Sequence, residues 1–179
     1  MEFDYTVQNF KECTASHKMK YKKFDEERKN LDFGDEGYVE KQARAFVHYW
    51  LYSIEELPST IENFYNLLDD NFSINISSRL GSITDREEAI SWIDSLRRTH
   101  KCTYHKIEKF RAWATDDYDR ENQKINVEMT IDFAAIGITG SKIGNTTTYR
   151  WLIETEVDDE YPKIREMELK TVESFGILK

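Results

Sequence analysis

Residues 124–136, KINVEMTIDFAAI, alternate apolar and polar side chains along most of their length. The apolar set is Ile125, Val127, Met129, Ile131 and Phe133, and the residues between them are polar. A period of two residues predicts a β-strand with one face on a core and the other in water. This run is longer than the usual strand of about 5–6 residues, and long strands twist and curl. The stretch therefore predicts part of a curved sheet.

Further strand patterns follow and precede this stretch. They cover residues 72–77, 102–115, 146–157 and 163–175. Polar or glycine-bearing loops are expected at residues 116–122, 137–145 and 158–162. Because these loops are short, the last four strands are expected to pair in antiparallel fashion.

Helical patterns come earlier in the chain. From Val39 to Ile54 the apolar residues recur every three or four positions, which predicts a helix with one buried stripe. His48 lies nearly opposite that stripe, so we expect it to be exposed. Two capping boxes, Ser59-x-x-Glu62 and Thr84-x-x-Glu87, open a short second helix and a third that ends near Thr99.

The order of these elements predicts one soluble α+β domain, in which a curved antiparallel sheet with three helices on its concave side encloses a pocket. This domain spans residues 37–179, and residues 1–36 form an N-terminal extension broken off at Gly34–Gly37. The extension is rich in Lys, Glu and scattered aromatic residues. Two alternatives fit it: a helix that packs on the domain, or a partly disordered arm.

Composition limits the function. The chain has 179 residues, with 25 Lys and Arg against 34 Asp and Glu, so its net charge is −9. An acidic chain repels phosphate backbones, and we expect no nucleic-acid partner. No apolar run is long enough for a membrane span, and the N-terminus lacks signal-peptide features. We therefore expect no membrane partner and a cytoplasmic location.

Cofactor and metal signatures are missing from the sequence. Cys13 and Cys102 have no CxxC partner, and the four His residues show no paired spacing. There is no Gly-rich phosphate loop and no Ser or Cys nucleophile signature. The sequence therefore predicts neither a cofactor nor a metal.

Four stretches resemble a known family. They are Leu67–Ile74, with its Leu-Leu-Asp-Asp-x-Phe-x-Ile pattern, Thr84–Ile90, Tyr104–Ile107 and Tyr149–Leu152. In order and pattern, residues 37–175 resemble the nuclear transport factor 2-like superfamily, and within it the SnoaL-like proteins. The resemblance implies a cone-shaped, cystatin-like α+β roll, often a homodimer through the outer face of the sheet. It leaves the function open, because members range from isomerases, dehydratases and cyclases to non-catalytic binders.

The candidate catalytic residues follow from this resemblance and from acid–base chemistry. His105 sits where members often place a pocket histidine, and its ordinary pKa suits a general base. Asp132 is a candidate second acid or base, and Tyr104 or Tyr149 a donor to a developing oxyanion. Each also has a structural explanation: a histidine bonded in the core or on the outer face, and an aspartate in ordinary polar alternation.

Aromatic residues are the candidate ligand-binding side chains. Their number along the predicted walls favours a small apolar or aromatic ligand, although such residues often form plain core. The candidates are Trp50, Trp92, Trp113, Tyr149 and Trp151.

One departure from the family bears on catalysis. Many catalytic SnoaL-like proteins carry an Asp near the end of the first helix, but Leu51–Glu56 contains none. Glu55 or Glu56 could replace it only with a shift in register. Three hypotheses follow: a lyase or isomerase acting on a small apolar carbonyl or hydroxyl compound; a non-catalytic binding or dimeric interaction protein; and a small subunit of a ring-hydroxylating dioxygenase-type complex.

Overall fold

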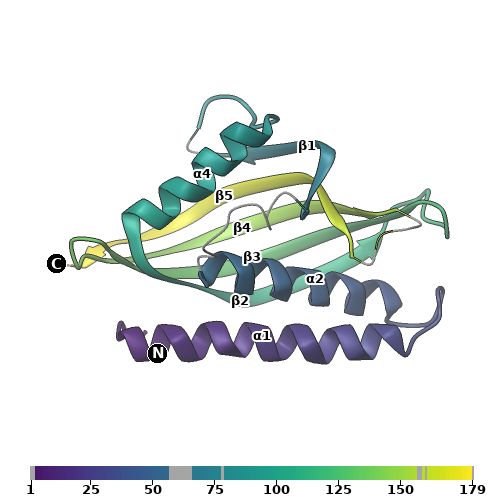
Figure 1. Ribbon diagram of the computed structural model, residues 1–179, viewed down its shortest axis with the longest axis horizontal. Helices are drawn as coiled ribbons and strands as arrows, with labels where there is room; N and C mark the ends of the chain where they lie inside the picture. Colours follow the sequence, from purple (N-terminus) through teal and green to yellow (C-terminus); the bar gives the residue numbers. More distant parts are fainter. Residues whose placement is uncertain (1–2, 57–65, 78, 157–158, 160, 179) are drawn as a thin grey trace.

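The computed structural model describes residues 3–56, 66–77, 79–156, 159 and 161–178. In this part of the chain, helices and a five-stranded sheet form the α+β fold expected from the sequence (Figure 1). The helices are α1 (Val7–Lys29), α2 (Tyr38–Glu55) and α4 (Arg86–Thr99). The strands are β1 (Leu68–Ile76), β2 (His100–Ala114), β3 (Gln123–Gly137), β4 (Lys142–Thr155) and β5 (Lys163–Leu178). The predicted helix at Ser59 lies outside the described residues.

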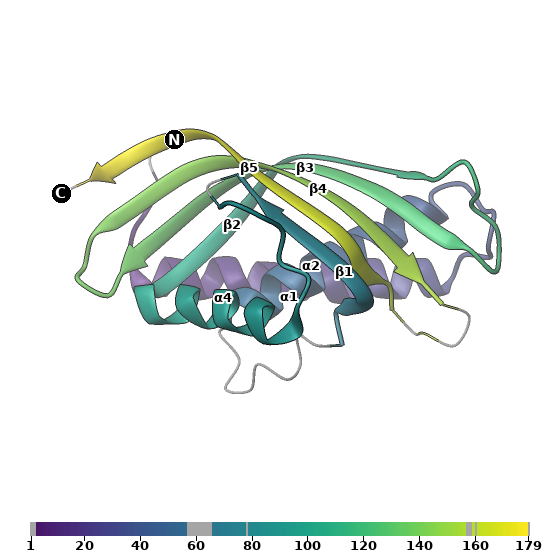
Figure 2. The ribbon, with the colours of Figure 1, turned by 90° about the horizontal axis from the view of Figure 1, so that it is seen from above.

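The strands lie in the order β1-β5-β4-β3-β2. The last four strands of the chain pair antiparallel, as predicted, but β1 pairs parallel to β5, so the sheet is mixed rather than purely antiparallel. A parallel neighbour needs a long crossover, which α4 and the later strands provide. Figure 2 shows the sheet arching over the helices, which lie on its concave side.

The core lies between α2 and the concave face of the sheet. Ile125, Val127, Met129 and Ile131 of β3 are each at most 1% exposed, so the predicted apolar face of this strand is the buried one. Trp50 of α2 packs edge-on against Trp151 of β4, with ring centroids 5.6 Å apart. This packing fixes α2 along the sheet and thereby fixes where its last turn ends.

A bulge interrupts β2 near Glu108. Ile107 pairs with Ile131 of β3, whereas Lys109 pairs with the adjacent Thr130. The extra residue reverses the alternation of inward and outward side chains along the strand. As a result, His105 points inward from the first half of β2, and the apolar side chains in the second half of β2 point inward as well.

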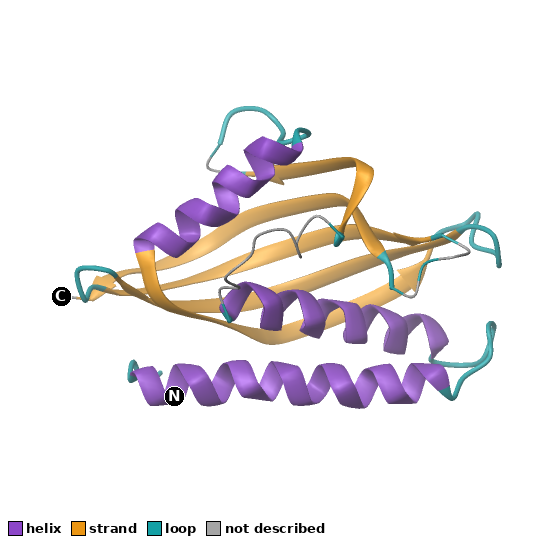
Figure 3. Cartoon of the chain, in the orientation of Figure 1, coloured by secondary structure: helices purple, strands orange, loops and turns teal. Residues whose placement is uncertain are grey.

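Helix α1 comes from the N-terminal extension, so the helical alternative is the one that the structure shows. Thr6 caps it by accepting from the amide of Asn9 at 3.3 Å. Its buried residues are Phe10, His17 and Asp25, which share one face. Figure 3 shows α1 running beside α2.

The N-cap of helix α4 lies one residue later than predicted. Asp85, rather than Thr84, is the N-cap, and its carboxylate accepts from the amide of Glu88 at 3.0 Å. A carboxylate at this position also interacts favourably with the positive end of the helix dipole, which a threonine hydroxyl cannot do as strongly.

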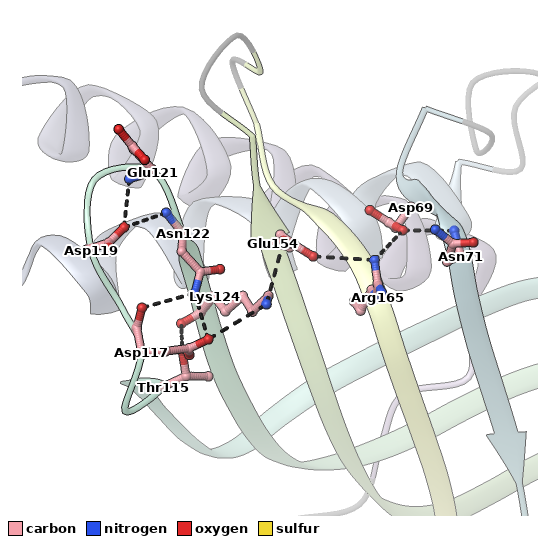
Figure 4. A network of polar contacts seen from close by, with 10 residues as sticks. All are labelled: Asp69, Asn71, Thr115, Asp117, Asp119, Glu121, Asn122, Lys124, Glu154 and Arg165. Carbon is pink, nitrogen blue, oxygen red and sulfur yellow. Dashed lines mark hydrogen bonds and ion pairs between the residues drawn. The ribbon is translucent and has the colours of Figure 1, made fainter.

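A charged network ties four strands together at one end of the sheet (Figure 4). Arg165 of β5 reaches Asp69 of β1 at 3.0 Å and Glu154 of β4 at 3.7 Å. Lys124 of β3 then lies 4.0 Å from Glu154 and 3.9 Å from Asp117 in the loop after β2. The network explains the acidic residue after the Leu67-Leu68 pair: its carboxylate holds the parallel strand β1 against β5.

Replacing Arg165 by Met should lower the free energy of unfolding by about 1–3 kcal/mol, because it leaves the buried Asp69 carboxylate without its cation. Urea denaturation measures this change. The matched control is Arg150→Met, which breaks the exposed pair with Glu128 and should cost less than about 1 kcal/mol. Equal losses in the two variants would contradict a structural role for the network.

Candidate functional site

A pocket of about 250 Å³ lies between the helices and the concave face of the sheet, at the end opposite the charged network. Its helical wall is apolar and consists of Ile54, Trp92 and Leu96. The strands add the larger side chains Ile76, Phe133, Tyr149 and Leu169. The polar side chains in its wall are Thr103, His105, Asn145, Thr147 and Thr171. The pocket is therefore mostly apolar, with one titratable imidazole.

His105 lines the pocket with a buried carboxylate behind it. Its Nδ1 lies 3.1 Å from Oε1 of Glu55, whose side chain is fully buried at the end of α2. The same oxygen accepts from the main-chain amide of His105 at 2.6 Å. Two hydrogen bonds from one residue thus fix both the imidazole and the strand that carries it.

The Glu55 carboxylate is held in its charged form. Burial alone would raise its pKa, but hydrogen bonds from His105 and His17, together with the positive charge of these imidazoles when they are protonated, outweigh burial and lower the pKa below its ordinary value. Thr14 also donates to Oε2 at 2.9 Å. These hydrogen-bond donors compensate for the lost hydration of the carboxylate and for its unfavourable position at the negative end of the α2 helix dipole.

The charged carboxylate determines which nitrogen of His105 carries the proton. An ionised carboxylate only accepts, so Nδ1 of His105 must donate to it. In the neutral imidazole Nε2 then keeps its lone pair. Since Nδ1 faces Glu55 and the ring lines the pocket, Nε2 is the nitrogen that a bound molecule meets. The arrangement can remove a proton from a ligand in the pocket.

Two further histidines lie behind this pair. Nε2 of His17 lies 2.8 Å from the carbonyl oxygen of His105 and 3.5 Å from Oε1 of Glu55. Nδ1 of His17 lies 2.9 Å from Nδ1 of His48, so only one of these two atoms can carry a proton. Burial, together with the nearby charge of His17, lowers the pKa of His48 to about 3, so His48 is neutral at physiological pH.

Hydrogen-bonding groups in the strands face the same pocket. The hydroxyl of Thr103 is buried and, among the described residues, has no hydrogen-bond partner. Thr147 donates to Oδ1 of Asn145 at 3.0 Å, which leaves the amide hydrogens of Asn145 for other acceptors. Burial raises the pKa of Tyr149, so its hydroxyl keeps its proton. These groups can orient a polar atom of a ligand or donate to a developing negative charge.

Three of the predicted site residues, His105, Trp92 and Tyr149, meet at the pocket. Trp50 and Trp151 lie instead in the packed core, 1% and 2% exposed. Trp113 lies beyond the bulge near the end of β2, where it is 39% exposed and stacks on Arg111. Trp50 and Trp151 pack against each other between α2 and the sheet, and Trp113 lies toward the other end of β2 from His105.

The other two catalytic candidates lie away from the pocket. Tyr104 follows Thr103 and precedes His105, so strand alternation turns it to the other face, where it stacks on Phe3 and meets the ring of His17 at a tilt. Asp132 lies between the inward-facing Ile131 and Phe133 and accepts from Thr146 at 2.7 Å on the outer face. Neither side chain can act on a ligand bound beside His105.

Sequence reasoning missed Glu55 as the partner of His105 and predicted the wrong environment for His48. His48 is only 3% exposed, because α1 covers the face of α2 that lies away from the sheet. The available signal for Glu55 was its position in the last turn of a helix, directly after the apolar Ile54. An acid is unfavourable there unless something compensates for it.

Two kinds of feature are absent from the part of the chain that the structure describes. No group of three or more His, Cys, Asp or Glu side chains is arranged to hold a metal ion. None of the helices is long and apolar enough to cross a membrane.

Comparison with solved structures identifies the fold as that of the nuclear transport factor 2-like superfamily, also described as cystatin-like. A superfamily protein from Salmonella enterica serovar Typhimurium matches with a TM-score of 0.63 and 12% identity, over 79% of this chain and 96% of that one. The expected fold is thus confirmed. Neither a family model nor a curated protein sequence matches the chain.

Several of the structural neighbours bear enzyme names. The hexachlorocyclohexane dehydrochlorinase LinA type 2 matches with a TM-score of 0.63 and 13% identity, over 78% of this chain and 88% of that one. A proposed scytalone dehydratase from Novosphingobium aromaticivorans matches with a TM-score of 0.64 and 11% identity, over 75% and 85%. At these identities the likeness concerns the fold, and the chemistry must be argued from the site.

The neutral His48 predicts a specific loss of stability in acid. Its folded pKa, about 3, lies below its unfolded value of 6.5, so the unfolded chain binds more protons between these values. The stabilising contribution is complete above pH 6.5 and falls by up to about 1.4 kcal/mol per pH unit below it. In His48→Asn, which cannot titrate, urea denaturation between pH 5 and 6.5 should show a flatter dependence. An unchanged slope would contradict the buried neutral imidazole.

Proposed function

We propose that this protein is a lyase or isomerase that uses His105 as a general base on a small, uncharged and mostly apolar compound. The observation that carries the proposal is the hydrogen bond between His105 and the buried, ionised Glu55 at the wall of an apolar pocket. A buried carboxylate behind an imidazole orients the ring and stabilises the imidazolium that forms when the base takes a proton.

The chemistry balances without any further reactant. Nε2 of His105 takes a proton from a carbon of the substrate, and the electron pair of the broken C–H bond forms a new double bond. In an elimination, that double bond expels a leaving group with its bonding electrons. In an isomerisation, the imidazolium returns the proton at another carbon. Tyr149 and Asn145 supply donors for the negative charge that develops.

The pocket limits the class of substrate. Its volume of about 250 Å³ is below the common range for ligand pockets, about 300–1,000 Å³, so it suits a single ring or a compound of similar size. None of the described residues that line it is Lys, Arg, Asp or Glu. An ionic substrate would lose its hydration there without gaining a counter-charge, which favours a neutral compound.

The names of two structural neighbours support an elimination. LinA is named a dehydrochlorinase and the Novosphingobium protein a proposed scytalone dehydratase, so both names describe removal of a small molecule from a substrate. The alternative of a non-catalytic binding protein is less well supported. Ligand binding alone does not require an ionised carboxylate behind a pocket histidine, and burying that charge is energetically costly.

The expected homodimer remains a prediction. The outer face of the sheet carries polar side chains, among them the Arg150–Glu128 ion pair and Asp132 with its partner Thr146. A dimer through this face would therefore have a polar interface. The cytoplasmic location also remains a prediction.

A substrate-independent probe of a general base is 5-nitrobenzisoxazole, whose C–H proton is removed while its N–O bond breaks to give a coloured phenolate. Wild-type protein should accelerate this reaction, and His105→Ala should lower kcat/KM by about 10²–10⁴-fold, the usual contribution of a general base. Phenolate absorbance gives the rate.

The matched control for this prediction is His100→Ala. His100 is on the same strand, but its Nδ1 lies 3.0 Å from the carbonyl oxygen of Leu96 and it does not line the pocket. This variant should retain the wild-type rate. If the two variants lose activity equally, or if His105→Ala loses none, His105 is not the base. Chloride release from hexachlorocyclohexane and dehydration of scytalone then test the two named chemistries directly.

A further inference from the structure

Helix α1 lies in the N-terminal extension, outside the stretch whose sequence resembles the superfamily, yet it reaches the candidate site. It packs along α2 and contacts the edge strand β2 (Figure 1). Thr14 and His17 lie one turn apart on α1, so they share a face. Both side chains point at the Glu55–His105 pair from the side opposite the pocket.

The edge position of β2 makes these contacts consequential. An edge strand leaves alternate main-chain groups without a strand partner. At His105 both such groups are bonded to side chains: the amide to Glu55 at 2.6 Å and the carbonyl oxygen to Nε2 of His17 at 2.8 Å. One bond comes from α2 and the other from α1, so the main chain of the proposed base is held from two helices.

The carboxylate is clamped in a similar way. Oε1 of Glu55 accepts both hydrogen bonds from His105, and Oε2 accepts from Thr14 at 2.9 Å. Without Thr14, the carboxylate could rotate about its last bond and carry Oε1 away from Nδ1. Its position therefore depends on α1 as much as on α2.

A helix needed only to cover the core would be expected to bury apolar side chains here. Phe10, on the same face of α1, does so and is 2% exposed. At Thr14 and His17 the helix instead contributes polar groups to a network in which His17 and Glu55 are almost fully buried. Buried polar groups stabilise less than apolar ones of similar size, so their presence favours a role in the site.

We infer that α1 is an integral part of the proposed active site, in which Thr14 and His17 are positioning residues that keep His105 in its Nδ1-protonated form. The inference rests on the proposed function. It predicts a defined defect when the donors are removed: the imidazole should populate both neutral forms, and turnover should fall because the base is misaligned. Substrate binding should change little, since neither side chain lines the pocket.

The test compares Thr14→Val and His17→Leu, which remove the donors, with Thr14→Ser and His17→Gln, which keep one. The control Phe10→Leu weakens the packing of α1 without touching the network. In the full chain, ¹⁵N NMR of the histidine rings reports which nitrogen of His105 is protonated, and 5-nitrobenzisoxazole reports turnover. Thermal unfolding shows how much each variant is destabilised.

Thr14→Val and His17→Leu should mix the two neutral forms of His105 and lower kcat roughly 10–100-fold with KM nearly unchanged. Thr14→Ser, His17→Gln and Phe10→Leu should keep the wild-type ring signals. Unchanged His105 signals in the donor-less variants, or an equal change in Phe10→Leu, would overturn the inference. The NMR result decides it even if the probe is not turned over, whereas a His105→Ala variant that keeps full turnover overturns the proposed function alone.

Discussion

The arrangement depends on one buried negative charge, the carboxylate of Glu55 at the end of α2. It is out of water and at the unfavourable end of a helix, so it persists only because His105, Thr14 and His17 surround it. Those partners come from β2 and α1. The position of the charge therefore requires the packing of α2 on the sheet, the bulge that turns β2, and the docking of α1 to be compatible with one another.

The sheet could be predicted because its pattern is local. The alternation in residues 124–136 gives both the strand and its buried face, and the same reasoning places the strands beside it. The parallel pairing of β1 with β5 could not be predicted, because it joins segments far apart in the chain. The bulge near Glu108 could not be predicted from the sequence either, because it reverses the alternation in the middle of one strand.

The site was predictable only in part. His105, Trp92 and Tyr149 could be proposed from the resemblance and from residue chemistry, and the structure brings these three to one pocket. Glu55 could be named only as a possible replacement for the family's first-helix Asp, because its pairing with His105 joins α2 to β2. The burial of His48 could not be predicted, because α1 covers it. That helix buries Phe10, His17 and Asp25, and since two of these three residues are polar, no apolar stripe marks its buried face.

The bonds made by His105 at the sheet edge also limit how this protein can assemble. A free edge strand invites pairing with a strand from another molecule, a common route to aggregation and to filament growth. Here the amide and carbonyl groups of His105 are already occupied by Glu55 and His17, and α1 contacts the same strand. A foreign strand could not extend the sheet across this position without first displacing the helix. The groups that align the imidazole therefore also protect this edge from strand addition.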